Sequence, residues 1–101
     1  ATCYARPIIE LDTDQALGIL SNAYAGCPFI VVDERLPSTK ATLGSNAAHL
    51  TTRVDPRTGL LIVLCAIDNL GKGASGQAVQ CTNLVLGLGE ATGLTNIGVY
   101  P

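Results

Sequence analysis

The stretch AAHLTTRVDPRTGLLIVLCAI, residues 47–67, decides the fold of this chain. Its first half alternates between apolar and polar residues, which predicts a strand with one solvated face carrying His49, Thr51 and Arg53. Residues 55–59, DPRTG, form a strong turn sequence, because proline presets one backbone angle and glycine accepts a positive one. Residues 60–67 should therefore return antiparallel, and the two strands form a hairpin.

Local signals predict the elements around this hairpin. A strand over residues 2–9 is interrupted late by Pro7, which is tolerated only at a strand end or edge. A helix with one apolar face begins at Asp12 or Thr13 and ends before Gly26. The other predicted elements are a buried strand over 28–32, a loop over 33–39, a short strand over 40–43 and a second helix over about 74–88. The order β-α-β-β-β-α predicts an α+β fold, a mainly antiparallel sheet with two helices packed on one face.

Composition predicts a single domain, residues 1–101, that needs a partner. Charged residues make up 14% of the chain, and 48% of the residues are apolar, whereas an average soluble domain has roughly 25% charged residues. We therefore expect apolar surface that a second copy or a missing domain covers. The net charge of −2 argues against a nucleic-acid partner. The longest apolar run, residues 60–67, is too short for a membrane span, which needs about twenty residues.

The cysteines and the single histidine give weak signals. The four cysteines contain no C-x-x-C pair, and their even number permits disulfides without requiring them. Cys65 and Cys81 lie within apolar patterns, and we expect them to be small buried residues. His49 alone cannot build a metal cluster, and a Cys–His pair is left open by the sequence. The first residues show no targeting peptide, which leaves open a signal already removed.

Residues 71–76, GKGASG, match G-x-G-x-x-G between a predicted strand and a predicted helix. A dinucleotide fingerprint also needs a second parallel strand with an acidic residue about 20 residues on, and the remaining chain is too short for it. The Walker A pattern fails as well, because Gly73 follows Lys72 where serine or threonine is required. Two interpretations stay open: the backbone N–H groups hold an anion or an amide with Lys72 nearby, or the glycines allow close packing.

Residues 65–80, CAIDNLGKGASGQAVQ, resemble the carboxy-terminal signature of N-acetyl-gamma-glutamyl-phosphate reductase. Residues 23–29, 83–88, 91–94 and 98–99 fit the same family in the same order, as do Gly44, Ser45 and Asn46. The resemblance covers essentially the whole chain. It implies the architecture of the glyceraldehyde-3-phosphate and aspartate-semialdehyde dehydrogenases. It also implies an enzyme of arginine biosynthesis that reduces an acyl phosphate with NADPH, through a thioester on a catalytic cysteine.

By this resemblance the chain corresponds to the last third of such a reductase, without the dinucleotide-binding domain and without the nucleophile and histidine segments. Cys3 echoes the nucleophile motif but lacks the preceding glycine and the following Pro-Thr, so we assign no catalytic residue. The resemblance implies that Gly44–Asn46 face the sheet that joins subunits. It also implies that one loop lies near the nicotinamide end of NADP in the full-length enzyme: Asn69, Gly71, Lys72 and Gly73. For the isolated chain we expect no cofactor and no metal.

Two functional hypotheses follow. In the first, the chain is the carboxy-terminal part of the reductase, inactive alone, with the missing amino-terminal domain or a second copy as its partner. It would then be cytoplasmic or organellar. In the second, it is a stand-alone structural module derived from a reductase that self-assembles into an oligomer or filament without catalysis. An extracellular location would be compatible with that role.

Overall fold

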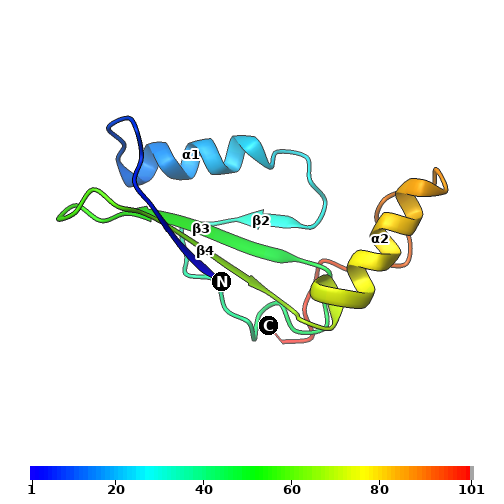
Figure 1. The fold of residues 1–101 in the computed structure, drawn as a ribbon. Helices are drawn as coiled ribbons and strands as arrows, with labels where there is room; N and C mark the ends of the chain where they lie inside the picture. The colour runs from blue at the N-terminus through cyan, green and yellow to red at the C-terminus, as the bar shows by residue number, and fades with distance from the viewer. Residues whose placement is uncertain (101) are drawn as a thin grey trace.

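The computed structural model describes residues 1–100. Four strands form one sheet in the order β1-β4-β3-β2: β1 (Thr2–Ala5), β2 (Ile30–Val32), β3 (Ala48–Val54) and β4 (Leu61–Ile67). The helical elements are α1 (Thr13–Ala23), the π-helical turn η1 (Gly71–Ser75) and α2 (Gly76–Val85). The predicted α+β class and the element order are confirmed (Figure 1).

The central hairpin has the predicted pairing. β3 and β4 are antiparallel, with Thr52 opposite Val63 and Val54 opposite Leu61. The turn between them closes when the Asp55 N–H donates to the Leu60 carbonyl over 2.9 Å. Gly59 has a positive φ of 70°, a conformation that glycine adopts without strain. The local turn chemistry therefore fixes the register of the two longest strands.

Helix α1 begins with a capping box. The Asp12 carboxylate accepts a hydrogen bond from the Gln15 N–H over 2.7 Å, and the Gln15 side chain accepts one from the Asp12 N–H over 3.1 Å. These two bonds satisfy backbone donors that the helix itself leaves free. The apolar face of α1 then packs on the sheet, with Ala16 buried. Of the two residues predicted as the start of the helix, Asp12 and Thr13, the structure shows Asp12 as the cap.

The two crossover connections lie on opposite faces of the sheet. β1, β2 and β3 run in the same direction, so the chain crosses the sheet through α1 and then returns through residues 33–47. Connections between parallel strands are right-handed, so two connections that run across the sheet in opposite directions lie on opposite faces of the sheet. Helix α1 covers the face that carries Thr52 and Val63, hereafter the α1 face. Residues 33–41 run over the other face beside His49, hereafter the His49 face.

This second crossover corrects the prediction of a solvated strand face. Thr51, on the His49 face, is completely buried, and His49 and Arg53 are half-buried. Arg53 folds back onto this face, donating to the Thr51 hydroxyl over 3.2 Å and to the Glu34 carbonyl. Alternation within one strand cannot reveal a loop that returns over it from elsewhere in the chain.

The structure shortens or removes three predicted strands. β1 ends at Ala5, before Pro7, which has no N–H to donate. β2 covers only Ile30–Val32 and pairs with β3 in parallel. Residues 40–43 are not a strand, because their N–H groups make turn hydrogen bonds instead: Ala41 donates to the Ser38 carbonyl and Leu43 to the Lys40 carbonyl.

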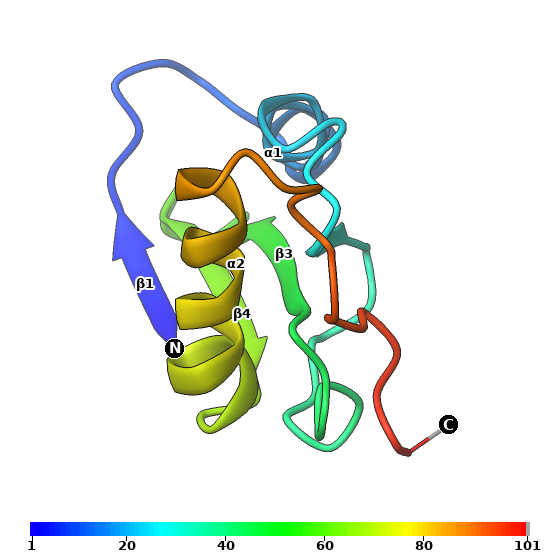
Figure 2. The ribbon, with the colours of Figure 1, turned by 90° about the vertical axis from the view of Figure 1, so that its right-hand side faces the viewer.

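Helix α2 extends beyond the end of β4 instead of lying on the sheet (Figure 1). η1 runs directly into α2, and the side chains of Gln80 and Asn83 bond α2 to Asn46 and to the tail, while α1 packs on β3 and β2. Figure 2 shows α1 end-on and α2 along its length, so the two helices form no common layer. The predicted arrangement of two helices on one face therefore holds for α1 only. Cys81, predicted to be buried, is exposed on α2 for the same reason, whereas Cys65 is half-buried.

The core is small for the size of the chain. Its buried apolar residues, among those described, are Phe29 and four alanines: Ala16, Ala47, Ala48 and Ala66. The accessible surface is 6541 Å², about 1,100 Å² more than a monomer of this mass normally exposes. The radius of gyration is 15.0 Å, compared with about 13 Å for a compact chain of this length. No helix within residues 1–100 has the length and apolar character needed to cross a membrane.

Candidate functional site

The turn after β4 is organised by a carboxylate. Asp68 accepts hydrogen bonds from the N–H groups of Gly44 (2.6 Å), Leu70 (2.7 Å) and Gly71 (3.1 Å). The Gly73 N–H donates to the Asp68 carbonyl over 2.8 Å. The N–H groups of Gly71 and Gly73 are therefore already used within the chain. This arrangement argues against the interpretation that the glycine-rich turn binds an external anion.

Two glycines of this turn allow close packing. A Cβ on Gly71 would lie 2.5 Å from the Ser45 carbonyl oxygen. A Cβ on Gly76 would overlap Asn46 Oδ1 and would lie 2.9 Å from the Gly71 carbonyl oxygen. The structure therefore supports the alternative interpretation of the motif, in which missing side chains bring η1 and α2 against residues 44–46. We call the meeting point of residues 44–46, 68–76 and Gln80 the junction.

A polar network crosses the junction. The Gln80 side-chain oxygen accepts from Asn46 Nδ2 over 2.9 Å and from Lys72 Nζ over 2.6 Å, and Gln80 Nε2 donates to the Glu90 carboxylate over 2.6 Å. Asn46 and Gln80 are buried and Lys72 is half-buried, with Nζ 5.5 Å from the centre of the Phe29 ring. The ammonium of Lys72 thus points into the protein.

The resemblance implied that Gly44, Ser45 and Asn46 face the sheet that joins subunits, and the structure buries Ser45 and Asn46 inside the chain while Gly44 is exposed. Ser45 and Asn46 are 3% exposed and are packed inside the chain. The Asn46 N–H donates to the Thr95 carbonyl over 2.7 Å, and Val99 donates to the Leu43 carbonyl over 2.9 Å. The carboxy-terminal tail thus covers this segment. A subunit contact through buried Ser45 and Asn46 side chains is not compatible with this packing.

The four predicted cofactor residues have different surroundings. A groove of about 330 Å³ is lined by residues of three segments, 44–46, 68–76 and 93–95, and Gly71 is the one of the four that lines it. Asn69 and Gly73 are exposed and adjacent, since a Cβ on Gly73 would lie 3.3 Å from Asn69 Oδ1. The same Cβ would lie 3.4 Å from the Asp68 carbonyl oxygen and 3.4 Å from Ile67 Cδ1, so Gly73 allows this loop to pack closely on itself. Lys72 points away from both features.

Sequence reasoning missed Gln80, the residue that connects the junction. In the sequence Gln80 is one polar residue within an amphipathic helical pattern, where a glutamine normally lies on the exposed side. Its burial depends on Asn46, 34 positions earlier, and on Glu90 in the tail. The sequence did contain a signal for this burial. Gly76, Gln80 and Asn83 recur at helical spacing, and they are the buried residues of α2.

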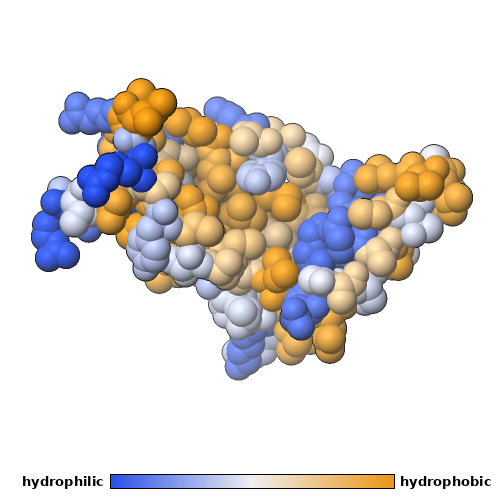
Figure 3. Space-filling view, in the orientation of Figure 1, coloured by the Kyte–Doolittle hydropathy of each residue, from blue (hydrophilic) through white to orange (hydrophobic). Residues whose placement is uncertain are grey.

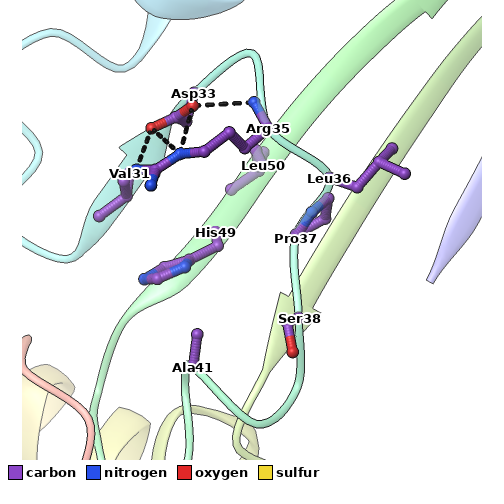
Figure 4. Close-up of a pocket in the computed structure, with 9 residues that line it drawn as sticks. All are labelled: Val31, Asp33, Arg35, Leu36, Pro37, Ser38, Ala41, His49 and Leu50. Atoms are coloured by element: carbon purple, nitrogen blue, oxygen red, sulfur yellow. Dashed lines mark hydrogen bonds and ion pairs between the residues drawn. The ribbon is translucent and has the colours of Figure 1, made fainter. Parts of the chain in front are cut away.

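A second pocket, of about 200 Å³, contains His49 (Figure 4). It lies where the second crossover passes over the His49 face, and an exposed ion pair between Arg35 and Asp33, 2.8 Å long, borders it. No cysteine lines this pocket. Cys65 lies opposite Leu50 in the sheet, so its side chain points to the α1 face, away from the side chain of His49. Within residues 1–100, no three His, Cys, Asp or Glu side chains are grouped to hold a metal ion. The pocket therefore carries no Cys–His pair.

We expect acid to weaken the fold through its hydrogen-bonded carboxylates. Backbone N–H groups, that of Gly44 first, lower the pKa of Asp68, and the Arg35 side chain lowers the pKa of Asp33 to about 2. A carboxyl whose pKa is lower in the folded state stabilises the fold above its unfolded pKa, and this contribution is lost as protons bind. The free energy of unfolding should therefore fall as the pH drops from about 4 toward 2.

Urea titrations followed by circular dichroism at several pH values measure this effect. Asp68→Asn should lower the stability at neutral pH and make the acid dependence shallower than in the unmodified chain. Equal pH dependence in the two proteins would contradict the role given to Asp68.

The strands and helix of residues 1–69 belong to a known class of domain. Residues 1–69, from β1 to the end of β4, match the family described as "Semialdehyde dehydrogenase, dimerisation domain", and the chain belongs to this family. The match ends just before η1.

Similarity to individual proteins extends over the whole chain. It is 52% identical over 103 residues to a protein of Frankia casuarinae, 53% identical to one of Salinispora arenicola and 46% identical over 101 residues to one of a Bradyrhizobium species. Each of these relatives is named N-acetyl-gamma-glutamyl-phosphate reductase. The chain spans 30–31% of their length.

Proposed function

We propose that the chain forms the carboxy-terminal part of an N-acetyl-gamma-glutamyl-phosphate reductase, where it supplies the subunit interface and one side of the cofactor site. The observation that carries this proposal is the similarity of about half of all residues over the full chain to proteins of that name. Such a reductase would use NADPH to reduce an acyl phosphate in arginine biosynthesis. The chain contains no assigned nucleophile, so we expect it to be inactive alone.

The small core supports a role within an assembly. One phenylalanine and four alanines bury far less apolar surface than the 48% apolar composition provides. The excess accessible area, about 1,100 Å², exceeds the roughly 800 Å² that each partner buries in a standard interface. The excess surface is therefore large enough for at least one stable contact, and exposed apolar side chains such as Tyr4 and Leu36 form part of the surface.

The uncovered half of the His49 face is our candidate for the subunit interface. Tyr4 lies opposite Ile62, and Leu64 lies opposite Thr51, which places Tyr4, Ile62 and Leu64 on this face. Tyr4 is 68% exposed. The second crossover covers β3 on this face and contributes the exposed Leu36. A second copy would bury these apolar side chains.

The outer side of α2 is our candidate for the contact with the amino-terminal domain. Figure 3 shows apolar residues gathered at the far end of this helix, where Leu84, Val85, Leu86 and Leu88 are exposed. α2 lies outside the residues that match the dimerisation domain. We therefore assign the two apolar surfaces to two different partners, a second subunit and the remaining part of the longer chain.

Asn69, Gly71, Lys72 and Gly73 would form the cofactor side of this chain. Asn69 offers an amide donor and acceptor to the carboxamide of the nicotinamide, and Gly73 lets the loop fold closely against Asn69. Gly71 holds the turn in place through its packing on Ser45. NADPH, when bound, supplies the hydride for the reduction.

A chimeric enzyme tests the proposed function. The 103 residues of the Frankia casuarinae reductase that match this chain are replaced by it, and NADP reduction is measured in the phosphate-dependent reverse direction. We expect activity within about tenfold of the parent enzyme, because the replaced part contributes binding and assembly and not the nucleophile. The isolated chain should show none.

Two outcomes would contradict the proposal. A chimera that folds and assembles as the parent does, yet lacks activity, would favour the self-assembling structural module. Turnover by the isolated chain that disappears when Cys3 is changed to serine would show that the chain carries its own nucleophile.

A further inference from the structure

The inner stripe of α2 is polar, in contrast to an ordinary packed helix. Its buried residues are Gly76, Gln80 and Asn83, while apolar residues such as Val79 and Val85 are exposed. Buried amides are costly unless their hydrogen bonds are made. The amides of Gln80 and Asn83 make such bonds to segments outside α2. The stripe therefore has a connecting role rather than a role in apolar packing.

Gln80 connects three segments that are distant in the sequence. Its oxygen accepts from Asn46 in the segment after the second crossover and from Lys72 in η1, and its nitrogen donates to Glu90 in the tail. The amide thus stands between a cationic and an anionic group. Lys72 Nζ and the Glu90 carboxylate each lie 2.6 Å from one end of it. Charge-assisted hydrogen bonds of this kind are stronger than those between neutral groups.

We propose that Gln80 is a positioning residue, which fixes the loop of Asn69 and Gly73 by holding the ammonium of Lys72 inside the junction. This inference rests on the proposed function, in which that loop borders the cofactor. Lys72 then acts as the anchor of the loop and does not touch NADPH. Glu90 orients the Gln80 amide so that its oxygen faces Lys72.

The chimeric reductase described above provides the test, with steady-state kinetics for NADPH. Gln80→Leu and Lys72→Met should each raise the KM for NADPH about tenfold and leave kcat within about threefold, because a misplaced loop weakens cofactor binding. The double variant should be no worse than Gln80→Leu alone, because Gln80→Leu already removes the contact with Lys72 that Lys72→Met breaks. A purely structural role would lower the active fraction, and hence kcat, without moving KM.

An exchange of two groups supplies a conservative rescue. Gln80→Glu alone places two carboxylates together and should raise the KM for NADPH. Adding Glu90→Gln restores a donor for the new carboxylate, and the KM should return to within about threefold of the chimera. Thr82→Ala, which removes an exposed hydroxyl that bonds only the Ala78 carbonyl of the same helix, is the control and should leave both constants unchanged.

The possible failures can be told apart. A chimera without further substitutions that folds and assembles but is inactive overturns the proposed function, and this inference with it. Two results with an active chimera overturn the positioning role alone. In the first, Gln80→Leu leaves the KM for NADPH unchanged. In the second, the increases in KM caused by Gln80→Leu and Lys72→Met multiply in the double variant. If Gln80→Leu does not fold, the exchange that combines Gln80→Glu with Glu90→Gln decides, because failure of the rescue contradicts the proposed geometry.

Discussion

Gly76→Ala is expected to destabilise the isolated chain by about 1–3 kcal/mol, the usual cost of forcing an extra methyl group into a packed site. The new Cβ would overlap Asn46 Oδ1 and lie 2.9 Å from the Gly71 carbonyl oxygen. Asn46 cannot withdraw easily, because it is 3% exposed and its Nδ2 is bound to Gln80. Gly71→Ala should be at least as harmful, since its Cβ meets a backbone carbonyl, that of Ser45, at 2.5 Å. Urea denaturation gives the free energy of unfolding.

Gly18→Ala is the matched control for these glycine variants. Gly18 lies inside α1, and a Cβ there has no atom within 4 Å. The substitution should stabilise the chain by roughly 0.5–1 kcal/mol, because alanine loses less conformational entropy than glycine in a helix. A Gly76→Ala variant as stable as the unmodified chain would contradict the close packing of α2 on Asn46.

Tyr4→Asp is expected to weaken self-association of the isolated chain at least about thirtyfold, the effect of removing a strong interface residue. Tyr4 is 68% exposed on the His49 face, opposite Ile62. Burying a carboxylate against apolar side chains of a second copy costs far more than leaving it in water. Sedimentation equilibrium over micromolar concentrations measures the dissociation constant.

Ile19→Asp tests whether the location of the charge matters. Ile19 is 57% exposed, and it lies on α1, on the opposite side of the sheet. This variant should associate as the unmodified chain does. Equal losses in both variants would place the interface elsewhere, and an unmodified chain that stays monomeric at these concentrations would remove the basis for self-association.

The elements that the sequence predicted well are those whose signals are local. The capping box of Asp12 and Gln15 marks the start of α1 within four residues, and the turn 55–59 fixes the hairpin without help from the rest of the chain. Strand alternation also placed His49, Thr51 and Arg53 correctly on one face of the sheet, although this face is not solvated. Residues separated by one turn or one pleat determine these features.

The incorrect or missing predictions concern contacts between distant segments. Thr51 is buried because residues 33–41 cross over its strand, and Cys81 is exposed because α2 leaves the sheet. Gln80 acquires its role from Asn46 and Glu90, which only the fold brings together. The motif of residues 71–76 showed the reverse problem. The spacing of its glycines is visible in the sequence. The sequence does not show whether a ligand or the chain itself approaches Gly71 and Gly76, because that depends on where the fold places residues 44–46.

The scarcity of large buried side chains has a thermodynamic consequence. A chain whose buried apolar residues are one phenylalanine and four alanines gains little hydrophobic free energy to set against the entropy of ordering. A partner that binds only the folded form adds to this small stability by mass action. Under the proposed function, the folded fraction of this polypeptide should therefore rise with the concentration of a second copy or of the complementary part of the enzyme.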